Sequence, residues 1–564
     1  MTGSKKGKKR SKLKKEQLLD QPPIDFDKFF LSFVKWKPEV IKCVMSYIRS
    51  DCLHIFLDCD ALVPFILPYI NKHVQIYEHP INITGPLVWK TFQLEYTKVI
   101  HLSMSKLKEL MDKYKICPNE ATIYVEDSVN FTIDRKGNIR KDPENEDEDD
   151  YAYRDSVEFY EKLDKWCLYH QEILGKVKNW KLEDKIYQRD GAKFLSKLNS
   201  YMNLMSIDVA LPQFDNDVDP EAQKEILNCI PNSVSGLSFD MKDELTSFNF
   251  LRYSYLRKLE CPIFYRDHIN LIPPSVESLN IYVYGEAEVT FLDTDKVPPN
   301  LKQFTVGTGY GFPNIAILIK QMNKLEWFEY CHDSKITKLE SLCLPHSNIT
   351  SLVFQSCVFN DYSSIRKYKA LKRLWILHSN FPRKLFVSVE DFPNLQEFIF
   401  LPRSMVYYNP RFCVEPPASE NSSTVLDDRL VFPPNLGILQ IDGDLTIKTL
   451  NLPKKLNALT LKSSRFPKGI RFKLPDSISL LQITGTTVKS MNGFHFPTNL
   501  KYLAVCSNGL LKSMKGTNLK SLKYLYLVDF SGTSISDPDM PSKTNKYKYN
   551  SFTAPIKDND GYGY

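Results

Sequence analysis

Apolar residues recur as a short triplet along the second half of the chain. Between residues 433 and 527, an apolar lead position is followed by further apolar residues three and five positions later. The leads of these triplets are Leu436, Leu456, Ile478, Leu500 and Leu522, at spacings of 20, 22, 22 and 22 residues. Alternate residues of a strand face opposite sides, so the second and third members of each triplet share one face. The pattern predicts one strand per period, with its apolar face toward a shared core.

Weaker copies of the triplet extend the pattern toward the N-terminus. Their leads are Leu204, Val234, Leu256, Val276, Leu301, Leu325, Ile349, Leu371 and Leu395. The interval from 395 to 436 is close to two periods, which predicts that one repeat has become a loop within an insertion at 401–430. The phrase L-x-x-L-x-L at such a period is the signature of a leucine-rich repeat. The predicted fold class is α/β: a leucine-rich-repeat solenoid with a curved parallel β-ladder over residues 204–530.

A small polar residue follows five of the triplets, eight positions after the lead, and an apolar residue comes two positions later. The polar residues are Cys357, Ser379, Ser464, Thr486 and Asn508, and the apolar ones are Phe359, Phe381, Phe466, Val488 and Leu510. We expect the polar side chain to be buried and to bind turn backbone, because a buried polar group needs a hydrogen-bond partner. The apolar residue should then plug the turn.

The outward-facing strand positions, two and four residues after each lead, are the candidate binding surface. Most carry small or polar residues, but some carry Trp, Tyr and Arg, the types enriched at binding hot spots. The predicted substrate-binding residues are Trp327, Glu329, Arg373, Trp375, Tyr502, Tyr524 and Tyr526. The alternative is that tails or neighbouring loops cover some of them. Trp327 and Trp375 are two repeats apart, which places them on the order of 10 Å from each other.

Residues 21–76 have a different, helical pattern. Apolar residues recur at helical spacing in Val40, Ile41, Val44, Met45 and Ile48, with Pro38 near the helix start, where its missing N–H costs nothing. A further segment, 61–70, contains Pro64 and Pro68, which interrupt a helix there. Residues 74–77 predict a strand.

This segment resembles an F-box, whose phrase is roughly L-P-x-E-V-I-x-x-I-x-x-Y-L followed by S-D-L. The matching positions are Pro38, Glu39, Val40, Ile41, Val44, Tyr47, Ile48, Ser50, Asp51 and Leu53. The proline-led repeats are also similar to those of fungal and amoebal leucine-rich-repeat proteins. The resemblance to a fungal F-box-like protein implies a substrate-recognition subunit of a cullin-type ubiquitin ligase. Its N-terminal helices would bind a Skp-type adaptor, and through it the cullin, by Pro38, Ile41, Val44 and Leu53.

The same helices have a second interpretation. They could cap the open end of the solenoid core, as terminal repeats do. The chain would then be a leucine-rich-repeat scaffold for protein–protein interaction with no link to a ligase.

The region between the F-box-like segment and the solenoid, 77–203, predicts a capping or irregular region. Residues 121–125 and 131–133 predict two strands joined by a turn, and 153–174 and 192–204 predict helices. Residues 141–150 contain an acidic run that predicts a solvated loop. The basic segment 1–20 and the polar segment 531–564 predict disordered tails.

The net charge of +7 belongs to the N-terminal tail. Eight lysines and arginines precede Glu16, so the rest of the chain is close to neutral and does not predict a nucleic-acid-binding body. Nucleic acid remains a candidate partner only through the tail, whose alternatives are a nuclear-localisation signal or a solubilising arm. The 12 cysteines form no C-x-x-C pair, which predicts reduced thiols of a cytoplasmic or nuclear protein. The sequence contains no run of 18 apolar residues, so it predicts no membrane span.

No motif predicts catalysis. The stretch 307–311 is rich in glycine but lacks the lysine of a P-loop, and Cys331, His332, Cys343 and His346 lack the spacing of a zinc site. We therefore expect no enzyme activity, no cofactor and no bound metal.

Overall fold

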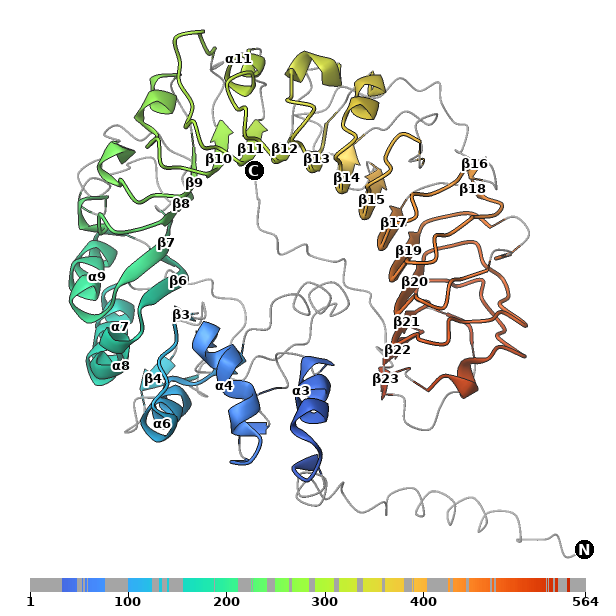
Figure 1. The fold of residues 1–564 in the computed structure, drawn as a ribbon, viewed down its shortest axis with the longest axis horizontal. Coiled ribbons are helices and arrows are strands. Elements are labelled where there is room, and N and C mark those ends of the chain that lie inside the picture. The colour runs from blue at the N-terminus through green and yellow to red at the C-terminus, as the bar shows by residue number, and fades with distance from the viewer. Residues whose placement is uncertain are drawn as a thin grey trace, which may run out of the picture. The chain divides into compact units, whose positions relative to one another are not determined.

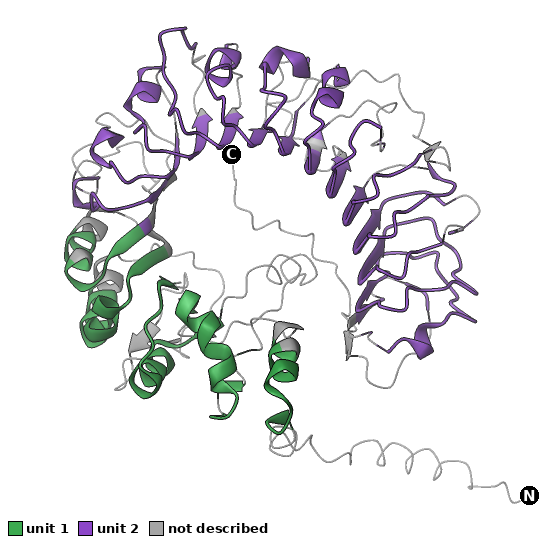
Figure 2. Cartoon of the chain, viewed as in Figure 1, with its two compact units in different colours: residues 1–184, 193–205 green, residues 185–192, 206–564 purple. Residues whose placement is uncertain are grey.

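The computed structural model describes residues 33–47, 53, 56–57, 59–76, 100–123, 131–133, 139–141, 156–186, 188–210, 225, 227–240, 249–262, 266–283, 290–308, 314–331, 338–357, 361–379, 388, 390–402, 425–426, 430–442, 446–466, 469–470, 473–523, 525, 527–530, 533–535 and 545–547. The chain divides into two compact units (Figure 2). Unit 1 comprises residues 1–184 and 193–205, and unit 2 comprises residues 185–192 and 206–564.

Unit 1 combines helices with short parallel strands (Figure 1). Its helices are α3 (Pro38–Tyr47), α4 (Val63–Lys72), α6 (Met104–Tyr114), α7 (Ser156–Tyr169), α8 (Gln171–Lys176) and α9 (Gln188–Tyr201), which begins in unit 2. Strand β1 (His73–Ile76) pairs in parallel with β2 (Ile100–Leu102) and β3 (Glu120–Ile123), and β3 pairs with β6 (Asn179–Ile186). An antiparallel hairpin joins β4 (Phe131–Ile133) to β5 (Ile139–Lys141).

The predicted pairing of the strands near residues 121 and 131 was therefore wrong. β3 is enclosed by β1 and β6 on its two edges, while β4 takes β5 as its partner. Proximity in sequence suggested a hairpin, but both hydrogen-bonding edges of β3 were already used by parallel neighbours.

Helix α4 also differs from the expectation that its prolines interrupt it. Pro64 lies in the first turn, where no N–H is needed, and Pro68 lies inside the helix. Pro68 is exposed, whereas Val63, Ile66 and Ile70 are buried on the opposite side. An internal proline costs about 3 kcal/mol or more, and burial of this apolar face offsets that cost.

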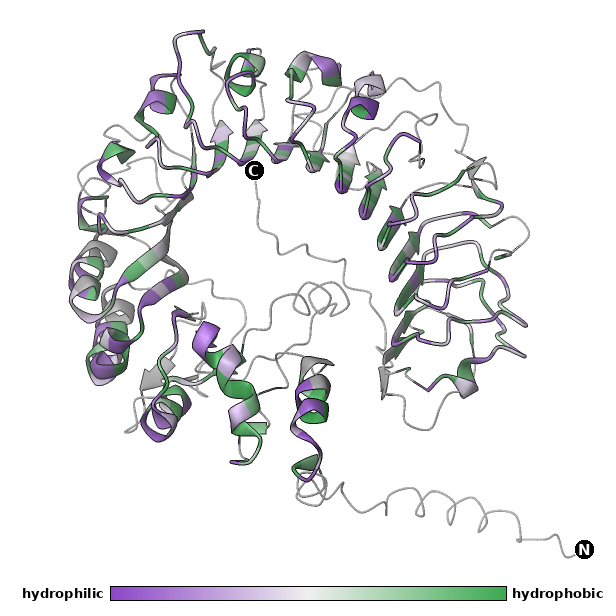
Figure 3. Cartoon of the chain, viewed as in Figure 1, coloured by the Kyte–Doolittle hydropathy of each residue, from purple (hydrophilic) through white to green (hydrophobic). Residues whose placement is uncertain are grey.

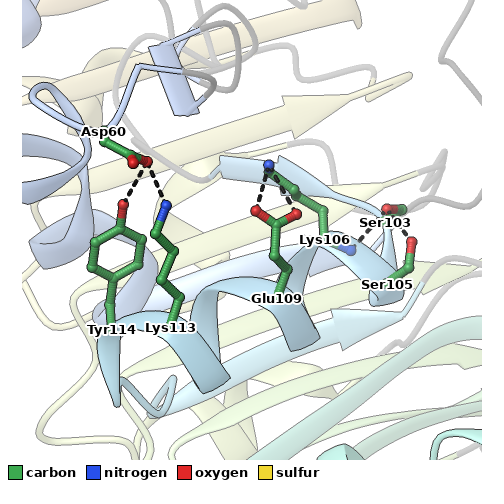
Figure 4. Close-up of polar contacts among 7 residues, drawn as sticks. All are labelled: Asp60, Ser103, Ser105, Lys106, Glu109, Lys113 and Tyr114. Carbon is green, nitrogen blue, oxygen red and sulfur yellow. Dashed lines mark hydrogen bonds and ion pairs between the residues drawn. The ribbon is translucent and has the colours of Figure 1, made fainter.

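Helix α6 is fixed at both ends by local chemistry (Figure 4). At its start, the Ser103 hydroxyl accepts a hydrogen bond from the Lys106 backbone N–H at 3.2 Å, an N-cap. At its end, Asp60 accepts hydrogen bonds from the Lys113 ammonium at 2.6 Å and the Tyr114 hydroxyl at 3.0 Å. The hydrogen bond from Lys113 is the main reason that the pKa of Asp60 is lowered. These contacts join the turn before α4 to α6.

Unit 2 is a ladder of parallel strands, each hydrogen-bonded to the next. The strands are β7 (Leu204–Ala210), β8 (Gly236–Asp240), β9 (Lys258–Pro262), β10 (Ser278–Val283), β11 (Gln303–Thr308), β12 (Trp327–Cys331), β13 (Ser351–Gln355), β14 (Arg373–Ser379), β15 (Glu397–Pro402), β17 (Ile438–Asp442), β19 (Ala458–Lys462), β20 (Leu480–Thr484), β21 (Tyr502–Ala504), β22 (Leu527–Asp529) and β23 (Asn545–Tyr547). Within this unit the strands lie along the concave side of an arc (Figure 1). The predicted fold class, a leucine-rich-repeat solenoid, is confirmed.

The outer side of unit 2 carries short helical turns (Figure 1). They are η2 (Phe250–Arg252), η3 (Arg266–Leu271), α11 (Ile315–Ile319), η4 (Leu339–Leu342), η5 (Ser363–Lys367) and η7 (Leu519–Ser521). These turns lead the chain from the end of one strand back to the start of the next.

The triplet residues form the core of this ladder. Hydrophobic residues recur at the same strand positions from repeat to repeat (Figure 3). Leu439, Leu459, Leu481 and Leu503 occupy equivalent positions on adjacent strands, and all are buried. The carbonyl of the proline three residues before the lead accepts a hydrogen bond from the backbone N–H of the lead. In one such turn the Leu436 N–H donates to the Pro433 carbonyl at 3.1 Å. The proline thus forms the turn that feeds the strand.

The long interval after β15 adds no strand to the ladder within the described residues. β15 pairs directly with β17 over four residues. Of the interval, the structure describes β16 (Val425–Leu426), which pairs with β18 (Thr446–Ile447) in a separate two-stranded sheet. The solenoid therefore remains continuous across 401–430.

The end of the ladder departs from the predicted register. Leu503 of β21 pairs with Val528, where the triplet placed Leu525. The apolar residues at 525, 527 and 528 fit either register, and strand pairing selects the later one. β23 then pairs with β22, although it falls within the segment predicted to be a disordered tail.

The polar residues after the strands bind backbone groups, as predicted, and some of these contacts reach the neighbouring repeat. All five are buried. The Ser379 hydroxyl accepts from the Cys357 backbone N–H of the preceding repeat at 2.9 Å; the Leu377 carbonyl at 2.7 Å and the Phe354 carbonyl at 3.2 Å are the acceptors for its own proton. Phe359 and Phe381 lie outside the described residues, and Phe466 and Val488 are buried plugs. Leu510 is 49% exposed, so the predicted plug was wrong there, and the next residue, Leu511, is buried instead.

Candidate binding surface

Four adjacent strands, β12 to β15, bring a group of large and charged side chains together on the outward side of the ladder. In one row, Trp327 pairs with Ser351, Ser351 with Arg373, and Arg373 with Glu397. In the next row, Glu329 pairs with Val353 and Val353 with Trp375. We call Trp327, Glu329, Arg373, Trp375 and Glu397 the Trp–Arg cluster.

The two indoles of the cluster are in contact. The ring centroids of Trp327 and Trp375 lie 6.0 Å apart at an interplanar angle of 82°, an edge-to-face arrangement. The expected separation of on the order of 10 Å counted only the spacing of the strands. The intervening strand carries the smaller Ser351 and Val353 at the paired positions, which leaves room for the two large rings to meet.

Arg373 is held by both indoles and by a carboxylate. Its guanidinium carbon lies 5.0 Å from the Trp327 ring centroid and 5.4 Å from that of Trp375. Its Nε and Nη2 donate to the two carboxylate oxygens of Glu397 at 2.6 and 3.0 Å. The bidentate pair fixes the plane of the guanidinium, which then rests against the rings. The Arg373 side chain nevertheless remains 31% exposed.

Glu329 has a different environment from Glu397. The Thr305 hydroxyl donates to its Oε2 at 3.4 Å, the Trp327 side chain also donates to the carboxylate, and the Cys331 thiol lies 3.8 Å from its Oε1. No lysine, arginine or histidine of the described chain forms an ion pair with it. Burial is the main reason that the pKa of Glu329 is raised, because desolvation disfavours the charged form.

The remaining predicted substrate-binding residues do not join this cluster. Tyr502 lies on β21 and is partly exposed, but β17, β19 and β20 separate its strand from β15. Tyr524 and Tyr526 lie outside the described residues.

The predicted adaptor-binding residues of unit 1 differ in exposure. Pro38, the first residue of α3, is exposed, and Val44 is half-buried. Ile41 and Leu53 are buried within the unit, where α3 packs against α4. The same segment exposes two other apolar side chains, Trp36 at 45% and Val40 at 43%.

Sequence reasoning missed Glu397, the partner of Arg373. The signal was available, because both residues lie two positions after their leads, in successive repeats. In a parallel ladder of constant register, such positions are neighbours. Thr305 and Glu329 follow the same rule one row further along.

In the part of the chain that the structure describes, no group of three or more His, Cys, Asp or Glu side chains gathers as a metal site. Cys331 is buried, Cys343 is exposed, and the His346 ring contacts the Tyr368 ring at 5.1 Å. His332 lies outside the described residues. None of the helices that are described is long and apolar enough to cross a membrane.

Comparisons with known proteins give weak likenesses. No family model matches the sequence, and a search of curated proteins finds no match. Among solved structures, the chain is similar to CroV588, a circular leucine-rich-repeat protein, with a TM-score of 0.34 and 11% identity over 67% of each chain. It is also similar to TLR13 in a complex with ssRNA13, with a TM-score of 0.28 and 14% identity over 83% of this chain. The chain spans 62% of the length of that second protein.

Proposed function

We propose that the chain is a protein-binding scaffold and that the Trp–Arg cluster is its recognition surface. The observation that carries the proposal is a partly exposed Arg373 in contact with two indoles, that of Trp375 on its own strand β14 and that of Trp327 on β12. Trp and Arg are the residue types enriched at binding hot spots. The chemistry of the Trp–Arg cluster would determine which protein substrate binds.

Rigidity supports this proposal. The side chains of the cluster project from hydrogen-bonded strands and are locked by ring contacts and by the bidentate pair with Glu397. A partner would therefore pay little conformational entropy to order this surface, which favours affinity.

The test removes the indoles and measures partner binding. Partners are captured by the intact chain, identified, and their affinities measured for Trp327→Ala, Trp375→Ala and the double variant. Each truncation should cost more than about 1 kcal/mol of binding free energy. Trp36→Ala is the matched control, because it removes an exposed indole from unit 1. Unchanged affinity in the double variant would refute the assignment of this surface.

We also propose the ubiquitin-ligase role as a second, separate function of unit 1. Its support is the F-box resemblance over 38–53, together with the position of Pro38 at the start of α3. The exposed Val40 and half-buried Val44 would offer an apolar face to a Skp-type adaptor, a helix-in-groove mode of binding. Ile41 and Leu53 would support that face from within unit 1.

Co-purification distinguishes this role from the scaffold alone. Val40→Asp should abolish binding to the adaptor and cullin, whereas Lys42→Ala, also exposed on α3, should not. If the intact chain fails to bind the adaptor at micromolar concentration, the ligase role is wrong and the scaffold proposal stands.

A further inference from the structure

The charges of the Trp–Arg cluster do not balance within the described chain. Arg373 and Glu397 neutralise each other through their bidentate contact. Glu329 then leaves one negative charge without a cationic partner. A surface that already uses its only arginine internally offers little to an acidic ligand.

Glu329 is also poorly solvated. The carboxylate accepts from the Thr305 hydroxyl at 3.4 Å, from the Trp327 side chain and from the Cys331 thiol at 3.8 Å, and none of these groups carries a positive charge. Burying a carboxylate without a paired cation costs free energy, and an incoming cation recovers part of that cost. The raised pKa of Glu329 reflects the same desolvation.

The two indoles of the cluster also favour a positively charged ligand. The faces of Trp rings attract cations through their quadrupole. Arg373 already contacts both rings, which shows that the indoles are oriented to accept a guanidinium. Trp327 is two residues from Glu329 on β12 and on the same side of the strand, so an indole and a carboxylate flank one position.

We infer that the Trp–Arg cluster binds a lysine or arginine side chain from a basic segment of its protein partner, with Glu329 as the counter-charge. This inference rests on the proposed function and specifies the partner's chemistry. Trp327 provides the apolar wall for the aliphatic stem of the incoming side chain, and the carboxylate of Glu329 receives its charged end.

The experiment uses a displayed library of random peptides panned against the intact chain. The Trp327→Ala/Trp375→Ala variant serves in counter-selection, so that the retained peptides depend on the cluster. We expect these peptides to be enriched in lysine and arginine. Their affinity should fall about tenfold or more in Glu329→Gln, the range measured for close charge pairs at interfaces. Glu340→Gln is the matched control, because Glu340 is exposed on the outer side of unit 2.

A double-mutant cycle then tests the pairing itself. Replacing the peptide's basic residue with glutamine should weaken binding to the wild-type chain but cause little further loss in Glu329→Gln. Selected peptides without basic enrichment, or additive losses in the cycle, would overturn the inference while leaving the binding surface intact. If no peptide depends on the two indoles, the proposed surface itself fails and the inference fails with it.

Discussion

Asn508 gives the sharpest test of how the repeats hold together. Its Oδ1 accepts from the backbone N–H and the hydroxyl of Thr486, both at 2.7 Å, and its Nδ2 donates to the Ile483 carbonyl at 2.7 Å. Asn508→Ala leaves one backbone donor and one backbone acceptor buried without a partner. Each such group costs about 1–3 kcal/mol, so the variant should lose about 2–6 kcal/mol of unfolding free energy.

The matched control is Asn499→Ala in the same repeat. Asn499 is exposed, and its Nδ2 donates to the Asp476 carbonyl at 2.9 Å, so water can replace the lost bond. Its cost should stay within about 0.5 kcal/mol. Urea unfolding gives the global loss, and hydrogen exchange over residues 480–510 locates it, because repeat arrays can open in segments. Equal losses in the two variants would refute the view that Asn508 ties the repeats.

Two further predictions concern burial on the two faces of the ladder and in the cluster. Leu459→Ala should cost about 2–5 kcal/mol of unfolding free energy by leaving a cavity. Thr460→Val should be neutral or stabilising in thermal unfolding, because the buried Thr460 hydroxyl has no hydrogen-bond partner among the described residues. A loss in Thr460→Val as large as that in Leu459→Ala would contradict the assigned register. The raised folded-state pKa of Glu329 means that its contribution to stability is full below the ordinary pKa of glutamate and is lost as pH rises through the folded value. Glu329→Gln should therefore raise the melting temperature at pH 7, with the difference vanishing toward pH 4; a difference independent of pH would show that desolvation of the carboxylate is not the cause.

The strands of the solenoid were predictable because the same contact is repeated. A triplet such as the one led by Leu456 buries its second and third residues wherever the period holds. The predicted register failed where several neighbouring apolar residues could occupy the same core position. Leu525 and Val528 are such residues, and only the pairing of β22 with β21 determines that Val528 lies opposite Leu503. The prediction failed in the same way at Leu510, where the adjacent Leu511 enters the core.

The Trp–Arg cluster was predictable in residue type but not in geometry. Outward Trp327, Arg373 and Trp375 followed from strand alternation alone. Their contact depends on how far large side chains lean across the strand between them, which no spacing rule gives. The unequal environments of Glu329 and Glu397 arise from the same packing, because Glu397 receives a guanidinium and Glu329 receives only uncharged donors.

The direct pairing of β15 with β17 has a use in protein engineering. The ladder is closed by hydrogen bonds between Glu397–Phe400 and Ile438–Ile441, so its integrity does not depend on the length of chain between them. Each doubling of a flexible loop costs only about 0.6 kcal/mol in closure entropy. A fluorescent reporter or a second recognition module spliced between Pro402 and Val425 should leave the strands in register. Such a graft would follow the strand that carries Glu397. A reporter placed there should therefore respond if a partner binds to the Trp–Arg cluster.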